Sequence, residues 1–175
     1  YALEGFHHVI ENEVLEKEEL LLMAEVHAQN HPSARFAIET AINDLLSKVV
    51  DKPMSKYLNP SACSKIKVNG MVGAHLPEDG FKVMKVKVGF RNLFDEIEQL
   101  EKLTNSFGED ILFRLDANGA FDLPRAIRFC KEMEKFNIDY VEQPLPANEL
   151  EDMAELNYHT EIPIAVDESL TDLKS

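Results

Sequence analysis

The segment Ile111-Leu-Phe-Arg-Leu-Asp116 is an apolar run that ends in a carboxylate, and two later segments repeat this arrangement: Ile138-Asp-Tyr-Val-Glu142 and Ile164-Ala-Val-Asp167. The three terminal acids are separated by 26 and 25 residues, about the length of one strand–loop–helix–loop unit. Such units build parallel α/β sheets and barrels, in which the carboxyl ends of the strands gather at one rim. The spacing therefore predicts three carboxylates on a common rim.

Three carboxylates on one rim repel each other unless a cation lies between them. Mg²⁺ is a hard cation that prefers oxygen ligands, so we predict a Mg²⁺ site on Asp116, Glu142 and Asp167, with Mn²⁺ as the alternative metal ion. Any single acid at a strand end more often caps the next helix, and the prediction depends on the three together. Of the adjacent acids Asp167 and Glu168, we assign Asp167 to the rim because Glu168 begins the loop. The site predicts metal-assisted chemistry on an anionic substrate.

Two lysines, Lys85 and Lys87, stand two positions apart in an apolar run, so in a strand their side chains point to the same face. If that face is the interior of a barrel, burial and a neighbouring cation lower the pKa of a lysine there, which can then act as a general base near neutral pH. If the strand lies at the edge of a sheet, both lysines are in water. The lysines by themselves leave both interpretations open.

The chain changes character near residue 63. Residues 1–62 have helical patterns, and Ser33 is a candidate N-cap for a helix that begins near Pro32. Residues 63–175 alternate strands with helices, which is typical of parallel strands with right-handed crossovers. Asp122 is placed to cap one of these helices, with Pro124 in its first turn. Strands are predicted at 66–72, 83–88, 111–115, 140–141 and 164–166, and helices at 93–105, 123–136 and 149–158.

One connection does not fit this pattern. Residues 74–80 are too few for a crossover helix, because parallel neighbours need roughly a dozen or more connecting residues. Either a helix is missing between the first two strands, or these strands are not parallel neighbours. Five strands also cannot close an eight-stranded barrel. We therefore expect the sequence to be an incomplete copy of a longer protein.

Composition excludes several classes of protein. The chain has 175 residues and a formal net charge of −14, from 18 basic and 32 acidic residues, which argues against binding to nucleic acid or to an anionic membrane surface. No signal peptide or membrane-spanning apolar run is present. The two cysteines form no metal or redox motif, and Cys130 falls in a helical apolar stripe, so we expect a buried free thiol. A cytoplasmic location is the expectation, and the sequence does not decide between a monomer and a homo-oligomer.

Four motifs in order resemble the muconate-lactonizing subgroup of the enolase superfamily. They are Lys85-Val-Lys87-Val-Gly89, Arg114-Leu-Asp116-Ala-Asn118, Val141-Glu142-Gln-Pro144 and Ala165-Val-Asp167-Glu-Ser169. The resemblance covers residues 30–175, and the ordered set is far more specific than any single motif.

Within that subgroup, two further stretches look most like the o-succinylbenzoate synthases: Pro32-Ser-Ala-Arg-Phe-Ala-Ile-Glu-Thr-Ala41 and Val68-Asn-Gly-Met-Val72. The resemblance implies a partial (β/α)₇β TIM-like barrel at 63–175, preceded at 1–62 by the helical part of an α+β capping domain. The later barrel units, including the strand that carries a further family lysine, do not occur in the sequence. Lys174 is too close to Asp167 to be that lysine.

The resemblance also implies a mechanism. Mg²⁺ would bind Asp116, Glu142 and Asp167, and Asn118 would hold its neighbours in place without touching the metal. Lys87 would remove a proton α to the carboxylate of a small-molecule substrate through a metal-stabilised ene-diolate, the pairing of base and metal for which the superfamily is known. Lys85 would lie beside Lys87, lower its pKa and contact the substrate carboxylate.

Three functions follow from these implications. The first is o-succinylbenzoate synthase, a carbon–oxygen lyase (hydro-lyase) of menaquinone biosynthesis. The second is a dipeptide epimerase or an N-succinylamino acid racemase of the same subgroup, which shares every motif quoted above. The third is a noncatalytic binding protein derived from the barrel. Three carboxylates at one rim argue against the third, because packing does not require them.

Overall fold

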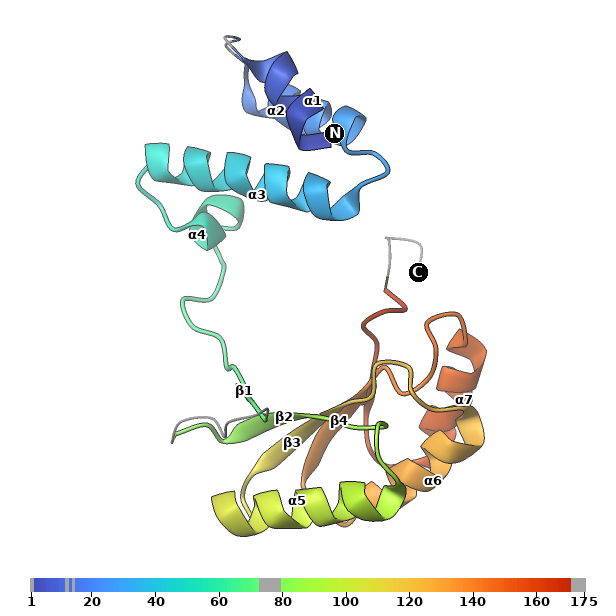
Figure 1. Cartoon of the computed structure of the whole chain (residues 1–175). Helices are drawn as coiled ribbons and strands as arrows, with labels where there is room; N and C mark the ends of the chain where they lie inside the picture. Colours follow the sequence, from blue (N-terminus) through green and yellow to red (C-terminus); the bar gives the residue numbers. More distant parts are fainter. Residues whose placement is uncertain (1, 12, 14, 73–79, 171–175) are drawn as a thin grey trace. The chain divides into compact units, whose positions relative to one another are not determined.

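The computed structural model describes residues 2–11, 13, 15–72 and 80–170. The chain divides into two compact units, Tyr1–Ile66 and Lys67–Ser175, which are coloured along the sequence in Figure 1. Within the described residues, no helix is long and apolar enough to cross a membrane.

The first unit is helical, as predicted for this part of the chain. It contains α1 (Ala2–Ile10), α2 (Lys17–His27), α3 (Pro32–Val49) and α4 (Met54–Leu58). Apolar side chains of the first three helices and of Ala28, which follows α2, form a small core: Phe6, Ala24, Ala28, Ile38 and Ile42. The assignment of this unit to a capping domain stays a prediction.

The predicted N-cap of α3 is wrong. The helix begins at Pro32, so Ser33 lies inside its first turn, and His31 occupies the N-cap position without a capping hydrogen bond from its side chain. Proline suits the first helical position because its φ is already helical and it lacks the N–H that would otherwise go unpaired there. The start of the helix is therefore determined by Pro32.

The second unit contains one sheet of five parallel strands. The strands are β1 (Gly70–Met71), β2 (Val83–Lys87), β3 (Leu112–Asp116), β4 (Ile138–Glu142) and β5 (Ile164–Ala165), and they are neighbours in sequence order. This order confirms the predicted α/β class. β1 is shorter than the strand predicted at 66–72, because Ile66 and Val68 are exposed and do not pair with β2.

The position of β2 resolves two alternatives from the sequence. β2 pairs in parallel with β1 on one side and with β3 on the other, so the edge-strand interpretation of the two lysines is wrong. The parallel pairing also excludes the alternative in which the first two strands are not parallel neighbours. Of the connection predicted to be too short, at 74–80, residues 74–79 lie outside the described part of the chain.

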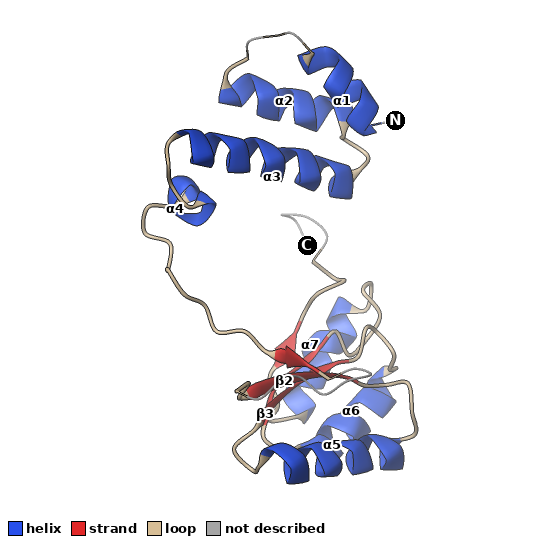
Figure 2. Cartoon of the chain, turned by 60° about the vertical axis from the view of Figure 1, so that its left-hand side comes forward, coloured by secondary structure: helices blue, strands red, loops and turns tan. Residues whose placement is uncertain are grey.

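Three helices cover one face of the sheet (Figures 1 and 2). They are α5 (Leu93–Phe107), α6 (Leu123–Met133) and α7 (Leu150–His159). Asp122 caps α6 as predicted, since its side chain accepts a hydrogen bond from the backbone N–H of Arg125. The largest buried side chains between these helices and the strands include Phe113, Met84, Leu100, Leu115, Met133 and Leu156. The strands thus bury one face and present Lys85, Lys87 and their neighbours on the other.

An irregularity in β4 sets the direction of its last side chains. Phe113 is paired with Ile138, but the next residue, Arg114, is paired with Tyr140, so Asp139 is an extra residue in β4. The Asp139 carboxylate accepts a hydrogen bond at 2.9 Å from Nε of Arg114. Beyond this β-bulge the alternation resumes, with Val141 fully buried in the core and Glu142 paired with Asp116.

Candidate active site

The carboxyl ends of β2, β3 and β4 bring three charged side chains together. Nζ of Lys85 lies 3.0 Å from Oδ2 of Asp116 and 2.8 Å from the carboxylate of Glu142. The side chains are 20%, 5% and 13% exposed, respectively, so little water screens their charges. We call Lys85, Asp116 and Glu142 the buried cluster. Two carboxylates of different strands therefore face one shared cation.

The expectation that a lysine here has a lowered pKa is wrong for Lys85. Partial burial is the largest single effect and lowers the pKa of Lys85, but the hydrogen bonds and negative charges of Glu142 and Asp116 together outweigh it. The net result is a raised pKa. Lys85 is therefore a permanent positive charge at neutral pH and cannot serve as the base in this arrangement.

Lys87 lies in a more open environment two residues further along β2. Its side chain is 54% exposed, and its Nζ donates a hydrogen bond at 2.6 Å to Oδ1 of Asn118. Nδ2 of Asn118 donates at 2.8 Å to Oε1 of Glu168. We call Lys87, Asn118 and Glu168 the open cluster. Nζ of Lys87 is 4.0 Å from Oδ2 of Asp116, so the two clusters adjoin.

Asn118 lies beside Asp116 and in contact with Lys87. Its backbone has a φ of 45°, a left-handed conformation that asparagine tolerates better than most residues. Its N–H donates at 3.2 Å to Oδ1 of Asp116. Asn118 therefore touches both Asp116 and Lys87.

Asp167 does not join the other predicted metal ligands through its side chain. Its residue is exposed, and among the described residues its carboxylate makes no ion pair or hydrogen bond. Throughout 2–11, 13, 15–72 and 80–170, no three acidic, histidine or cysteine side chains are grouped closely enough to hold a metal ion. The structure brings together Asp116 and Glu142, and it draws Glu168 toward the site through Asn118.

Two residues near the site were not singled out by the sequence. Glu168 was assigned to the loop, yet it is the acid that contacts Asn118. Gln143 was treated only as part of a motif, yet its side chain is fully buried and bonds to the backbone of Asp167 and Ser169. Gln143 stands between Glu142 and Pro144, outside any helix or strand pattern in the sequence. Its contacts can therefore be seen only in the folded structure.

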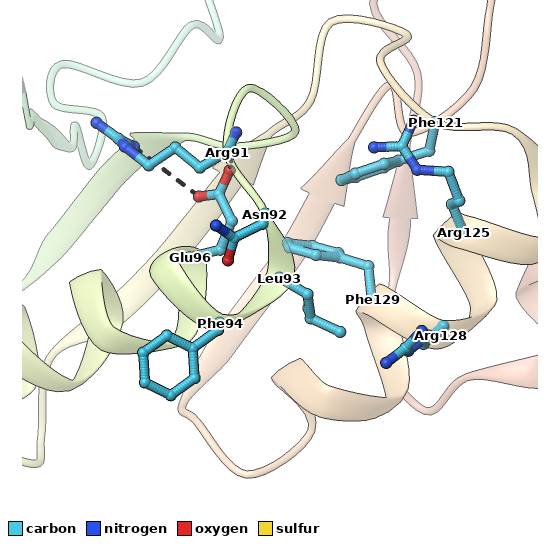
Figure 3. A pocket seen from close by; sticks show the side chains of 9 residues that line it. All are labelled: Arg91, Asn92, Leu93, Phe94, Glu96, Phe121, Arg125, Arg128 and Phe129. Atoms are coloured by element: carbon cyan, nitrogen blue, oxygen red, sulfur yellow. Dashed lines mark hydrogen bonds and ion pairs between the residues drawn. The ribbon is translucent and has the colours of Figure 1, made fainter.

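A separate pocket of about 400 Å³ lies between the first turns of α5 and α6. It contains none of the predicted site residues and includes Arg91, Arg125 and Arg128. Figure 3 shows Arg91 extending away from the other two arginines, and its guanidinium donates to Oε1 of Gln99 at 2.7 Å. The three guanidinium groups therefore do not converge on one anion.

Comparison with known proteins identifies the class. Residues 71–175 match the family model described as Enolase C-terminal domain-like, and the chain belongs to this family. The match confirms the resemblance to the enolase superfamily on which the sequence prediction depended.

Particular relatives of the chain differ in activity. It is 31% identical over 154 residues to the L-amino acid-D/L-Glu epimerase of Francisella philomiragia, covering 81% of this chain and 43% of the relative. It is 30% identical over 154 residues to the o-succinylbenzoate synthase of Desulfotalea psychrophila, covering 81% of this chain and 42% of the relative. The chain thus spans less than half the length of these relatives.

A solved structure shares the fold. The enolase from Bradyrhizobium, in complex with magnesium and mandelic acid, has a TM-score of 0.81 and 21% sequence identity, covering 95% of this chain and 51% of that protein. This likeness confirms the predicted α/β architecture as part of a TIM-like barrel.

Proposed function

We propose that the protein is a metal-dependent enzyme that removes a proton α to the carboxylate of a small molecule, with Lys87 as the base. The observation that carries the proposal is the pair of clusters at one rim: two carboxylates that share a cation, and an accessible amine 4.0 Å from one of them. A noncatalytic protein has no need for this combination.

The residues fit a Mg²⁺ ion by their chemistry. Asp116 and Glu142 already converge on one positive charge, at 3.0 and 2.8 Å, and carboxylate oxygens are the donors that Mg²⁺ prefers. Asp167 follows β5, the next strand, and its carboxylate makes no ion pair or hydrogen bond with another described residue. These three residues would hold the metal, and a bound Mg²⁺ would supply Lewis-acid stabilisation of the negative charge on the substrate carboxylate. Mg²⁺ and the Lys85 ammonium would compete for Asp116 and Glu142.

Lys87 acts as the base in this proposal, because its side chain is accessible to a substrate. In its neutral form, Nζ accepts the α-proton, and the hydrogen bond to Asn118 restricts the orientation of the amine. The Lys85 ammonium contributes positive charge beside the substrate carboxylate. In a dehydration, Lys87 returns the proton to the departing hydroxyl as the carbon–oxygen bond breaks, and water leaves.

Two reactions share this first step. Formation of o-succinylbenzoate is supported by the resemblance of residues 32–41 and 68–72 to the synthases and by the similarity to a synthase. Epimerisation of a dipeptide, or racemisation of an N-succinylamino acid, is supported by the similarity to an epimerase. Epimerisation needs a second acid–base group on the opposite face of the substrate, whereas dehydration needs only one.

One experiment separates the two reactions. The purified protein is incubated in D₂O with Mg²⁺ and either the cyclohexadiene carboxylate substrate of o-succinylbenzoate synthases or an L-Ala-L-Glu dipeptide. A synthase forms the aromatic product, and an epimerase incorporates deuterium at the α-carbon and inverts it. EDTA and Lys87→Met are expected to abolish whichever reaction occurs. Turnover that persists in EDTA or in Lys87→Met would contradict the proposal.

A further inference from the structure

Gln143 is an amide side chain with no contact to water and with every polar atom in use. It is 0% exposed. Its Oε1 accepts hydrogen bonds from the backbone N–H groups of Asp167 at 2.9 Å and Ser169 at 3.0 Å. Its Nε2 donates to the carbonyl of Leu145 at 2.9 Å and to Oγ of Ser169 at 2.7 Å. One side chain thus makes four hydrogen bonds, and three of them go to the segment 167–169.

The backbone of the same residue joins the neighbouring strand ends. Gln143 has a φ of 40°, an uncommon left-handed conformation for a long side chain. Its N–H donates to the carbonyl of Ala165 at 2.8 Å, and its carbonyl accepts from the N–H of Gly119 at 2.7 Å. Gln143 therefore connects the ends of β3, β4 and β5, the strands that carry the predicted metal ligands.

We infer that Gln143 is a positioning residue: it restrains the 167–169 backbone, which carries Asp167, beside the strand ends that carry Asp116 and Glu142. This inference rests on the proposed function, in which Asp167 would be a metal ligand. Asp167 and Glu168 are exposed, and among the described residues their side chains make one hydrogen bond, from Asn118 to Glu168. The bonds from the Asp167 and Ser169 N–H groups to Oε1 of Gln143 restrain the backbone on either side of Glu168.

The chemistry of an amide explains why glutamine suits this position. An amide oxygen has two lone pairs and can accept from two N–H groups, while the same side chain donates two further bonds. A methionine of similar size would leave the Asp167 and Ser169 N–H groups without a partner, which is unfavourable in a buried position. The segment 167–169 would then shift or open to reach water.

The first test measures the restraint itself, without metal. Amide hydrogen exchange is compared between wild type and Gln143→Met, with Ser169→Ala as the matched control. Ser169→Ala removes a bond to Nε2 but keeps both bonds to Oε1. We expect the Asp167 and Ser169 amides to exchange about tenfold faster in Gln143→Met, and the Asp167 amide to stay at the wild-type rate in Ser169→Ala. Equal rates in wild type and Gln143→Met would overturn the inference.

The second test measures Mg²⁺ affinity by calorimetry on the same proteins. Loss of a residue that orients metal ligands typically weakens binding about 10- to 100-fold, and we expect this for Gln143→Met but not for Ser169→Ala. If Gln143→Met does not fold, Gln143→Asn serves instead, since its shorter side chain cannot reach both amides, and the same direction is expected.

The outcomes separate the inference from the proposed function. If wild type binds Mg²⁺ and a folded Gln143 variant binds equally well, the inference fails and the function stands. If wild type does not bind Mg²⁺, the proposed function fails and the positioning of ligands for a metal fails with it, even where exchange shows that Gln143 restrains the segment. Faster exchange together with weaker Mg²⁺ binding supports both.

Discussion

The buried cluster and the open cluster use lysines only two residues apart on β2, yet they give them different tasks. Lys85 is 20% exposed and lies between two carboxylates, whereas Lys87 is 54% exposed and bonds to one neutral amide. A lysine between two acids balances their charge, whereas the more exposed amine of Lys87 is open to a substrate. We therefore expect substitution of Lys85 to affect stability and substitution of Lys87 to affect activity.

The largest expected effect is the loss of activity in Lys87→Met. Removal of a general base typically costs 10² to 10⁴ in rate, so we expect kcat to fall about 10³-fold in whichever reaction the protein catalyses. The free energy of unfolding should change by less than about 0.5 kcal/mol, because the side chain is exposed on the open side of the sheet. Lys82→Met, at an exposed position just before β2, is the control and should keep full activity. A kcat within tenfold of wild type would break the assignment.

The next effect is on stability. Lys85→Met leaves Asp116 and Glu142 facing each other with little water, so we expect the free energy of unfolding to fall by about 3 kcal/mol in urea denaturation. Added Mg²⁺ should restore part of this loss, because it replaces the missing positive charge. If Lys85→Met and Lys87→Met were equally stable, the distinction between the clusters would disappear.

Binding of Mg²⁺ should raise the free energy of unfolding of the wild-type protein by about as much as Lys85→Met lowers it. A ligand at one hundred times its Kd adds about 2.7 kcal/mol to the free energy of unfolding. We expect Asp167→Asn to unfold like wild type without Mg²⁺, because its carboxylate is exposed, and to lose most of the gain with Mg²⁺. Glu168→Gln is the matched control at the adjacent acid. A full Mg²⁺ gain in Asp167→Asn would remove Asp167 from the metal site.

The smallest expected effect is a pH dependence from Lys85. Because the folded protein raises the pKa of Lys85 above its usual value of 10.5, the favourable charge is fully present below the pKa of the unfolded chain. It is lost as pH rises through the raised folded pKa. The stability difference between wild type and Lys85→Met should therefore narrow above about pH 10.5. A difference that stays constant between pH 8 and pH 11.5, measured by urea denaturation, would show that charge is not its source.

The strands and the acids at their ends were predictable because parallel units repeat at a regular length. The approach of Asp116 and Glu142 to each other at one end of the sheet followed from that repeat, whereas their shared contact with Lys85 did not. The raised pKa of Lys85 did not follow, since it depends on which oxygen atoms lie within 3 Å. The contacts of Gln143 could not be predicted from the sequence either, because they join residues that are 24 and 26 positions apart.

The ends of the helices and strands were predicted correctly in some cases and wrongly in others. The N-cap of α6 was predicted correctly, because Asp122 and Pro124 both indicate the same first residue of the helix. Ser33 failed because Pro32 also fits the first helical position. The predicted strand at 66–72 was too long, because an apolar sequence does not reveal whether a neighbouring strand pairs with it.

The additional residue in β4 has a consequence for any comparison of this chain with its relatives. Asp139 has no partner across the ladder, while Tyr140, Val141 and Glu142 are paired in turn with Arg114, Leu115 and Asp116. A relative that lacks this one position can therefore pair β4 with β3 as a regular ladder and still present its acid beside Asp116. An alignment of β4 should place a single-residue gap at Asp139, so that the acids at the strand end stay matched.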